Sequence, residues 1–116
     1  MQTIRIKRIY DEQAEDDGYR VLVDRLWPRG VSKKAANLDE WNKEVAPSTE
    51  IRKWFGHKEE RFEEFALMYR DELKHKEPQL NELRAIAKNE PLSLLYAARN
   101  PMVNHALVLR DVLLGN

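Results

Sequence analysis

The side chains that could bind an anion or transfer protons gather just after an apolar run at residues 21–23. Asp24 and Arg25 follow that run directly, and Arg29 lies four residues beyond Arg25, after Pro28. Charged groups beside a buried strand lose hydration, so such positions often serve binding or catalysis. Two guanidinium groups on a turn stiffened by proline match the oxygens of a phosphate or a carboxylate. The pattern predicts a small-anion site, and the alternative is that Asp24 and Arg25 form an internal ion pair or cap neighbouring helices.

Three residues are candidates for acid–base catalysis: Asp24, His57 and His105. A histidine with the ordinary pKa of about 6.5 exchanges protons near neutral pH. His57 follows Gly56 in a predicted loop, where an exposed histidine without a role is the alternative. His105 lies in a predicted helix, where a partly buried ring bonded to the backbone is the more common outcome. His75 stands between two lysines and is expected on the surface.

Apolar patterns predict the strands that must position these residues. We expect strands at residues 3–9, 19–26, 41–46 and 92–98. Residues 21–23 and 92–98 are apolar enough to lie in the core, covered on both faces. Residues 41–46 are ambiguous, and alternation ahead of a proline favours a strand there.

Capping residues and apolar faces predict the helices. Ser48 or Thr49 begins a short helix that ends at Gly56, and the clearest helix spans residues 58–75. Pro78 fits the first turn of the next helix. Residues 31–40 form a loop or a short helix that Ser32 could cap.

Asn100 and Pro101 are expected to open the last helix. Its inward side chains would be Val103, Ala106, Leu107 and Leu114. The aromatic side chains Trp54 and Phe55 of the short helix are expected in the core.

This order of elements predicts one α/β domain over residues 1–116, with a small, mostly parallel sheet flanked by helices. Ligands bind at the carboxyl ends of parallel strands, beside the first turns of the following helices. Residues 24–30, 46–48 and 96–99 would then meet at one edge, next to the last helix. The candidate ligand-binding residues at that edge are Arg25, Trp27, Arg29, Ser48, Tyr96 and Asn104, although Trp27 could equally belong to the core.

Composition excludes several classes of function. Lys plus Arg equals Asp plus Glu, 20 of each, so binding to nucleic acid through bulk charge is not expected. No cysteine is present, and the three histidines lack metal-ligand spacing, so no metal site is expected. With only four glycines and no glycine-rich phosphate loop, no cofactor is predicted. The sequence shows neither a signal peptide nor a membrane span, which predicts a cytoplasmic protein, and it leaves the oligomeric state open.

Several long motifs resemble one known family. They are residues 8–11 (RIYD), 16–31 (DDGYRVLVDRLWPRGV), 46–57 (APSTEIRKWFGH), 94–98 (LLYAA) and 104–106 (NHA). Together they resemble the YeaO-like members of domain-of-unknown-function family 488. The resemblance implies a small cytosolic bacterial or archaeal α/β protein without a demonstrated activity. The signature residues that it carries over are Asp24, Arg25, Pro28, Arg29, Ser48, Trp54, His57, Tyr96, Asn104 and His105.

The chain departs from the family pattern near the last helix. The wider family often has a Cys-His-Arg triplet there, where this chain has Asn104, His105 and Ala106. Two hypotheses follow. The first is an enzyme that acts on a small phosphorylated or nucleotide-like substrate, with arginines holding the anion and Asp24, His57 or His105 moving protons. The second is a non-catalytic domain that binds a small anionic ligand or a partner protein through the same arginines.

Overall fold

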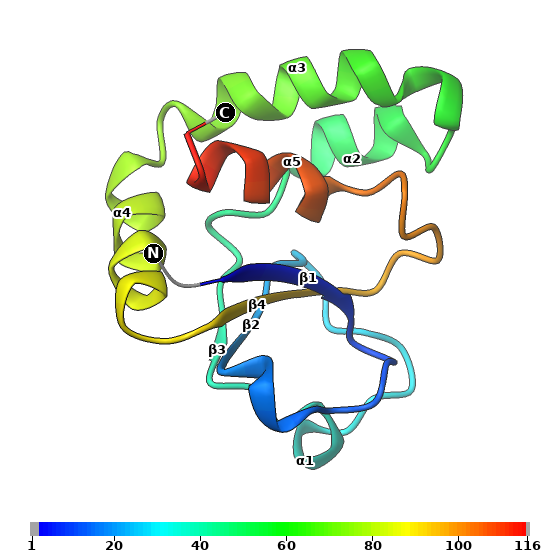
Figure 1. The fold of residues 1–116 in the computed structure, drawn as a ribbon. Helices are drawn as coiled ribbons and strands as arrows, with labels where there is room; N and C mark the ends of the chain where they lie inside the picture. Colours follow the sequence, from blue (N-terminus) through cyan, green and yellow to red (C-terminus); the bar gives the residue numbers. More distant parts are fainter. Residues whose placement is uncertain (1–2, 116) are drawn as a thin grey trace.

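A four-stranded parallel sheet forms the centre of the computed structural model, which describes residues 3–115 (Figure 1). The strands are β1 (Ile4–Arg8), β2 (Tyr19–Leu22), β3 (Glu40–Trp41) and β4 (Leu92–Tyr96). Their order across the sheet is β1-β4-β2-β3, so strands distant in sequence become neighbours. Leu94 of β4 lies opposite Ile6 on one side and Val21 on the other. The predicted single α/β domain with a parallel sheet is confirmed.

The longer helices cover one face of the sheet. They are α2 (Thr49–Phe55), α3 (Phe62–Leu73), α4 (Glu77–Asn89) and α5 (His105–Leu113). In Figure 1, α2, α3 and α5 lie above the sheet and α4 lies to its left. Side chains alternate between the two faces of a strand, so Val21 and Leu94 pack in the main core with Tyr69. The helices therefore cover this face of the sheet, where Val21 and Leu94 are fully buried and Ile6 and Tyr19 are partly buried.

Shorter elements cover the opposite face. These are η1, a 3-10 turn at Glu15–Asp17, and α1 (Lys33–Ala36), both below the sheet in Figure 1. A smaller cluster lies here, with Leu22 and Leu95 packed against Ala36. This face also carries charged side chains from β1 and β2.

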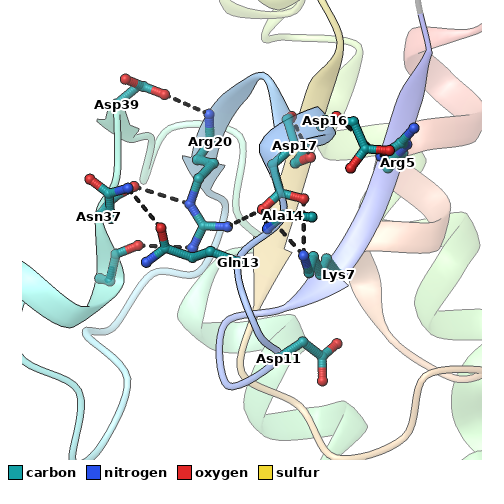
Figure 2. Close-up of polar contacts among 12 residues, drawn as sticks. Arg5, Lys7, Asp11, Gln13, Ala14, Asp16, Asp17, Arg20, Asn37 and Asp39 are labelled. Atoms are coloured by element: carbon teal, nitrogen blue, oxygen red, sulfur yellow. Dashed lines mark hydrogen bonds and ion pairs between the residues drawn. The ribbon is translucent and has the colours of Figure 1, made fainter.

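A buried ionic network, the Asp17 network, occupies part of that second face (Figure 2). Asp17 is 2 % exposed and Arg20 is 5 % exposed. The Asp17 carboxylate accepts hydrogen bonds from Lys7 Nζ at 2.9 Å and from Arg20 Nη1 at 2.6 Å. Arg20 also donates to the carbonyls of Ala36 and Asn37, at 2.9 and 3.0 Å. These contacts fasten η1 and α1 to the sheet.

Several predicted helix boundaries are confirmed by their caps. Ser32 Oγ accepts from Ala35 N, and Ser48 Oγ accepts from Ile51 N. Gly56 ends α2 with φ of 53°, a left-handed conformation that glycine adopts without strain. Pro78 lies in the first turn of α4, as predicted. The predicted helix at 58–75 is divided into a 3-10 turn, η2 (Glu59–Arg61), and α3.

All four strands are shorter than predicted, and the difference is largest for β2 and β3. β2 ends at Leu22, although Val23 N still donates to Leu95 O at 3.0 Å. In the segment 41–46 only Trp41 is in a strand, β3. The residues after it turn instead, because Asn42 Oδ1 accepts from Val45 N at 3.3 Å. The alternation there reflects a turn with buried side chains and not a strand.

The last helix and Trp54 also differ from prediction. Asn100 and Pro101 lie in a turn, and α5 begins only at His105. Asn104 is the actual cap, since its Oδ1 accepts from Leu107 N at 3.2 Å. Of the side chains predicted to point inward, Ala106 is buried, Val103 and Leu107 are partly buried, and Leu114 is 36 % exposed. The other buried side chains of α5 are Val108, Leu109 and Leu113. Trp54 is 38 % exposed and not a core residue, whereas Phe55 is buried as predicted.

Candidate functional site

A cavity lies at the carboxyl edge of the sheet. It has a volume of about 700 Å³ and is lined by the loop after β2 (residues 24–29) and the loop after β4 (residues 97–100). Residues 103–105 at the start of α5, together with Arg52, Phe55 and His57, complete much of the wall. The carboxyl ends of neighbouring parallel strands meet at this edge, which explains why distant loops share one cavity.

Asp24 and His105 form a close pair in the wall of this cavity. Asp24 Oδ2 accepts a hydrogen bond from Ala97 N at 2.9 Å. His105 Nε2 lies 3.0 Å from Val23 O and 3.1 Å from Asp24 Oδ1. Both of these atoms are acceptors, so Nε2 carries the ring proton, and it donates to Val23 O, leaving Oδ1 without a regular hydrogen bond. The pair thereby joins the loops after β2 and β4 to α5.

Arg25 is held by the backbone of the segment before α2. Its Nε donates to Pro47 O at 3.0 Å, and its Nη2 donates to Ala46 O at 3.3 Å. The carbonyl of Asp24 accepts a further hydrogen bond from the Trp41 indole at 2.8 Å. The alternative considered above, an ion pair between Asp24 and Arg25, is not formed, and both side chains have other partners.

Tyr69 packs beneath the Asp24–His105 pair. Its hydroxyl donates to Val45 O, and its ring lies 6.2 Å from the His105 ring in a T-shaped arrangement. Burial raises the pKa of Tyr69 well above its ordinary value, and the negative charge of Asp24 raises it further. The phenol therefore stays protonated at physiological pH and acts as a hydrogen-bond donor.

Three arginines of the cavity have no polar partner among the residues that the structure describes. The guanidinium groups of Arg29, Arg52 and Arg99 make no hydrogen bond or ion pair with the rest of residues 3–115, and Arg52 Nε is buried. Asp24 is the one carboxylate in the lining, against these three arginines and Arg25. The wall is therefore positively charged in a chain whose formal net charge is zero.

Sequence reasoning missed Arg52 and Arg99. Arg99 directly follows the predicted strand 92–98, so the rule that ligands bind at strand ends already pointed to it. Arg52 lies on α2, one turn after its Ser48 cap, and nothing in the sequence shows that its guanidinium is unpartnered.

The remaining candidates fall into two groups. Trp27, His57 and Asn104 line the cavity, and Ser48 and Tyr96 do not. The Trp27 indole donates to Val31 O at 2.6 Å, and its ring meets that of Trp41 at 5.2 Å, so it also has a packing role. His57 is exposed and has φ of 58°, with its ring 6.1 Å from that of Phe55.

Asn104, Ser48 and Tyr96 have structural roles. Asn104 is 1 % exposed, caps α5 and donates to Asn100 O at 3.0 Å. Ser48 caps α2, and Tyr96 is 2 % exposed within the core. The structure thus gathers seven of the nine predicted residues around the cavity: Asp24, Arg25, Trp27, Arg29, His57, Asn104 and His105.

Residues 3–115 hold no group of three or more His, Asp or Glu side chains placed to bind a metal ion. Across the same residues, no helix has the length and apolar character needed to cross a membrane.

Comparison with known proteins identifies relatives along nearly the whole chain. A family described as "Inactive DUF488-N3 subclade" matches residues 3–116. The Uncharacterized protein YeaO of Escherichia coli (strain K12) is 51 % identical over 108 residues, which cover 93 % of this chain and 94 % of that protein. The Uncharacterized protein Rv3073c of Mycobacterium tuberculosis (strain H37Rv) is 43 % identical over 112 residues, covering 97 % and 94 % respectively. No solved structure is significantly similar to this chain.

Proposed function

Because the chain belongs to the DUF488 family, in the subclade described as inactive, we propose that it binds a small anionic ligand without converting it. The binding site is the cavity at the carboxyl edge of the sheet. The observation that carries this proposal is that Arg29, Arg52 and Arg99, which have no polar partner among residues 3–115, all line this one cavity. The cytoplasm of a bacterial cell is the proposed location, as the relatives named above come from bacteria.

Charge in the wall favours an anion. Guanidinium groups form short, charge-assisted hydrogen bonds with phosphate and carboxylate oxygens, and a buried donor without an acceptor is costly. An anion would supply acceptors to Arg52 Nε and to the two exposed guanidinium groups together. The first turn of α5 also faces the cavity at Asn104 and His105, and helix N-termini favour negative charge.

Binding is favoured over catalysis by the contacts of Asp24 and His105. The Asp24 carboxylate accepts a hydrogen bond from Ala97 N, and the His105 ring donates one to Val23 O. Both side chains therefore already hold the backbone of neighbouring loops in place. The position where the wider family often has Cys-His-Arg carries Asn104, His105 and Ala106 here, which lack both the thiol and the guanidinium. The word "inactive" in the description of the subclade agrees with this absence.

Calorimetric titration with inorganic pyrophosphate tests the proposal. We expect saturable binding that weakens at least about tenfold in each of Arg29→Ala, Arg52→Ala and Arg99→Ala, as each removes about one charge-assisted hydrogen bond. Arg110→Ala is the matched control, because Arg110 is also unpartnered among the described residues but lies outside the cavity. Absence of binding by pyrophosphate, phosphate and sulfate, or an equal loss in Arg110→Ala, would refute the proposed site.

A further inference from the structure

We infer that the ligand of this site is a phosphate ester with an aromatic body, of the size of a mononucleotide or nucleoside diphosphate. The inference rests on the proposed function, since it names the class of anion that the same cavity accepts. Three features carry it: the volume of the cavity, its apolar floor, and an open aromatic ring beside Arg29.

The cavity is too large for an inorganic anion alone. Its volume of about 700 Å³ falls within the range of about 300–1,000 Å³ that is usual for sites of organic ligands. A phosphate or sulfate ion bound to Arg29, Arg52 and Arg99 would leave most of this space to water. The site is therefore matched to an anion that carries an organic body.

The floor of the cavity is apolar. Phe55 and Phe65 are 5 % and 1 % exposed, and their rings stack with centroids 4.4 Å apart. Ala98 and Val103 line the cavity with them. Polar groups of the ligand would lose hydration against this floor without finding partners, so the body that contacts it is largely apolar.

Tyr10 provides an aromatic surface beside the anion-binding group. Its ring is 46 % exposed, lines the cavity, and carries the Arg8 guanidinium over its face at 4.8 Å from the centroid. The Tyr10 hydroxyl donates to Arg29 O at 2.9 Å, which fixes the ring next to Arg29. A planar ring stacked on the face of Tyr10 that Arg8 does not cover would lie beside the loop that carries Arg29.

Calorimetric titrations of the wild-type protein with AMP, ADP, ribose 5-phosphate, adenosine and pyrophosphate separate the parts of the ligand. We expect AMP or ADP to bind at least about tenfold more tightly than ribose 5-phosphate, because stacking of a base contributes about 1–3 kcal/mol. ADP should also bind more tightly than pyrophosphate, and adenosine should bind weakest.

Two substitutions at Tyr10 locate the aromatic contact. Tyr10→Leu should abolish the preference for AMP over ribose 5-phosphate, with both affinities measured in the same variant. Tyr10→Phe is the matched control, because it keeps the ring and should keep most of the preference. Tyr10 is half exposed, so thermal unfolding should show both variants folded.

The outcomes distinguish this inference from the proposed function. If pyrophosphate binds but nucleotides bind no more tightly, the site takes small anions and the nucleotide inference is wrong. Binding of ribose 5-phosphate as tight as that of AMP overturns the aromatic requirement. A 5′-phosphorylated oligonucleotide that binds at least tenfold more tightly than AMP would show a nucleic-acid site instead. If none of the anions bind, both the inference and the proposed function fail.

Discussion

At the scale of single residues, Arg52 combines a stability cost with a proposed binding role. Its Nε is buried without a hydrogen-bond partner, on a helix that is otherwise well capped. A buried donor without an acceptor costs roughly 1–3 kcal/mol relative to a satisfied one. Such a cost is retained more readily at a position that serves binding than at one that serves only packing.

The substitution Arg52→Met should therefore stabilise the unliganded protein or leave its stability unchanged. Methionine keeps an apolar stem of similar length and removes the unsatisfied donor, so we expect the free energy of unfolding to rise by up to about 1 kcal/mol. Urea denaturation of both proteins without ligand measures the difference. A loss of more than about 1 kcal/mol would mean that Arg52 has a structural partner in solution.

The sequence located residues at the cavity where charged side chains directly follow a buried strand. Asp24, Arg25 and Arg29 follow a buried strand, and that placement alone put them at the cavity. Ser48 and Tyr96 satisfy the same rule but lie outside the lining, because a strand end also holds caps and core residues. Whether an arginine is partnered depends on tertiary contacts, which no sequence pattern displays.

At the scale of elements, the Asp17 network helps to hold η1 and α1 against the second face of the sheet, whereas the longer helices cover the first face. Burial favours the neutral form of Asp17, but hydrogen bonds from Lys7, Ala14 N and Arg20 outweigh it and lower the pKa of the carboxyl. Figure 2 shows how these partners come from β1, the loop before η1, and β2. The second face is thus held by ionic contacts joining separate segments of the chain.

This network predicts a dependence of stability on pH. The folded pKa of Asp17 lies below its ordinary value of 3.8, so its stabilisation is complete well above pH 3.8 and declines as pH falls through the folded pKa. At pH 7, Asp17→Asn should lower the free energy of unfolding by about 3 kcal/mol, since it leaves Arg20 buried with a weakened partner. Urea unfolding between pH 2 and 7 should show the gap between wild type and variant narrowing in acid.

The matched control is Asp16→Asn, which removes an exposed ion pair with Arg5. Exposed pairs contribute little, so this variant should stay within about 0.5 kcal/mol of wild type at all pH values. A pH dependence shared by both variants would contradict the assignment to Asp17.

Element boundaries show what local patterns can and cannot decide. The caps at Ser32 and Ser48 act within one turn of their own helices, so their sequence signals were reliable. Asn100 carries the same signal, but Asn104 is the residue that caps α5, after a turn that forms the cavity wall. Competition between two equivalent caps is decided by the packing of the whole loop against the sheet.

At the scale of the whole molecule, acidic and basic residues are equal in number but unevenly distributed over the structure. The cavity holds four arginines and one carboxylate, and the compensating acidic residues lie elsewhere. The order of strands was not predictable from the sequence, but the parallel arrangement was, and it is the parallel arrangement that brings the loops together.

This uneven distribution of charge predicts a dependence of binding on salt. Raising NaCl from 50 to 500 mM should weaken pyrophosphate binding by roughly threefold or more, because the Debye length shortens and screens the rim arginines Arg29 and Arg99. Calorimetric titration at both concentrations measures the change. An affinity unaffected by salt would indicate that the arginines do not provide the binding energy.

The position of β1 at the edge of the sheet has a consequence for self-association. Within residues 3–115, β1 pairs only with β4, so its other side is open, and open edges can recruit a strand from another chain. Three of its five residues are basic, Arg5, Lys7 and Arg8. A second copy adding at this edge would bring like charges together along the new strand pair. The sequence of β1 therefore protects the protein from edge-to-edge aggregation while its inward isoleucines complete the core.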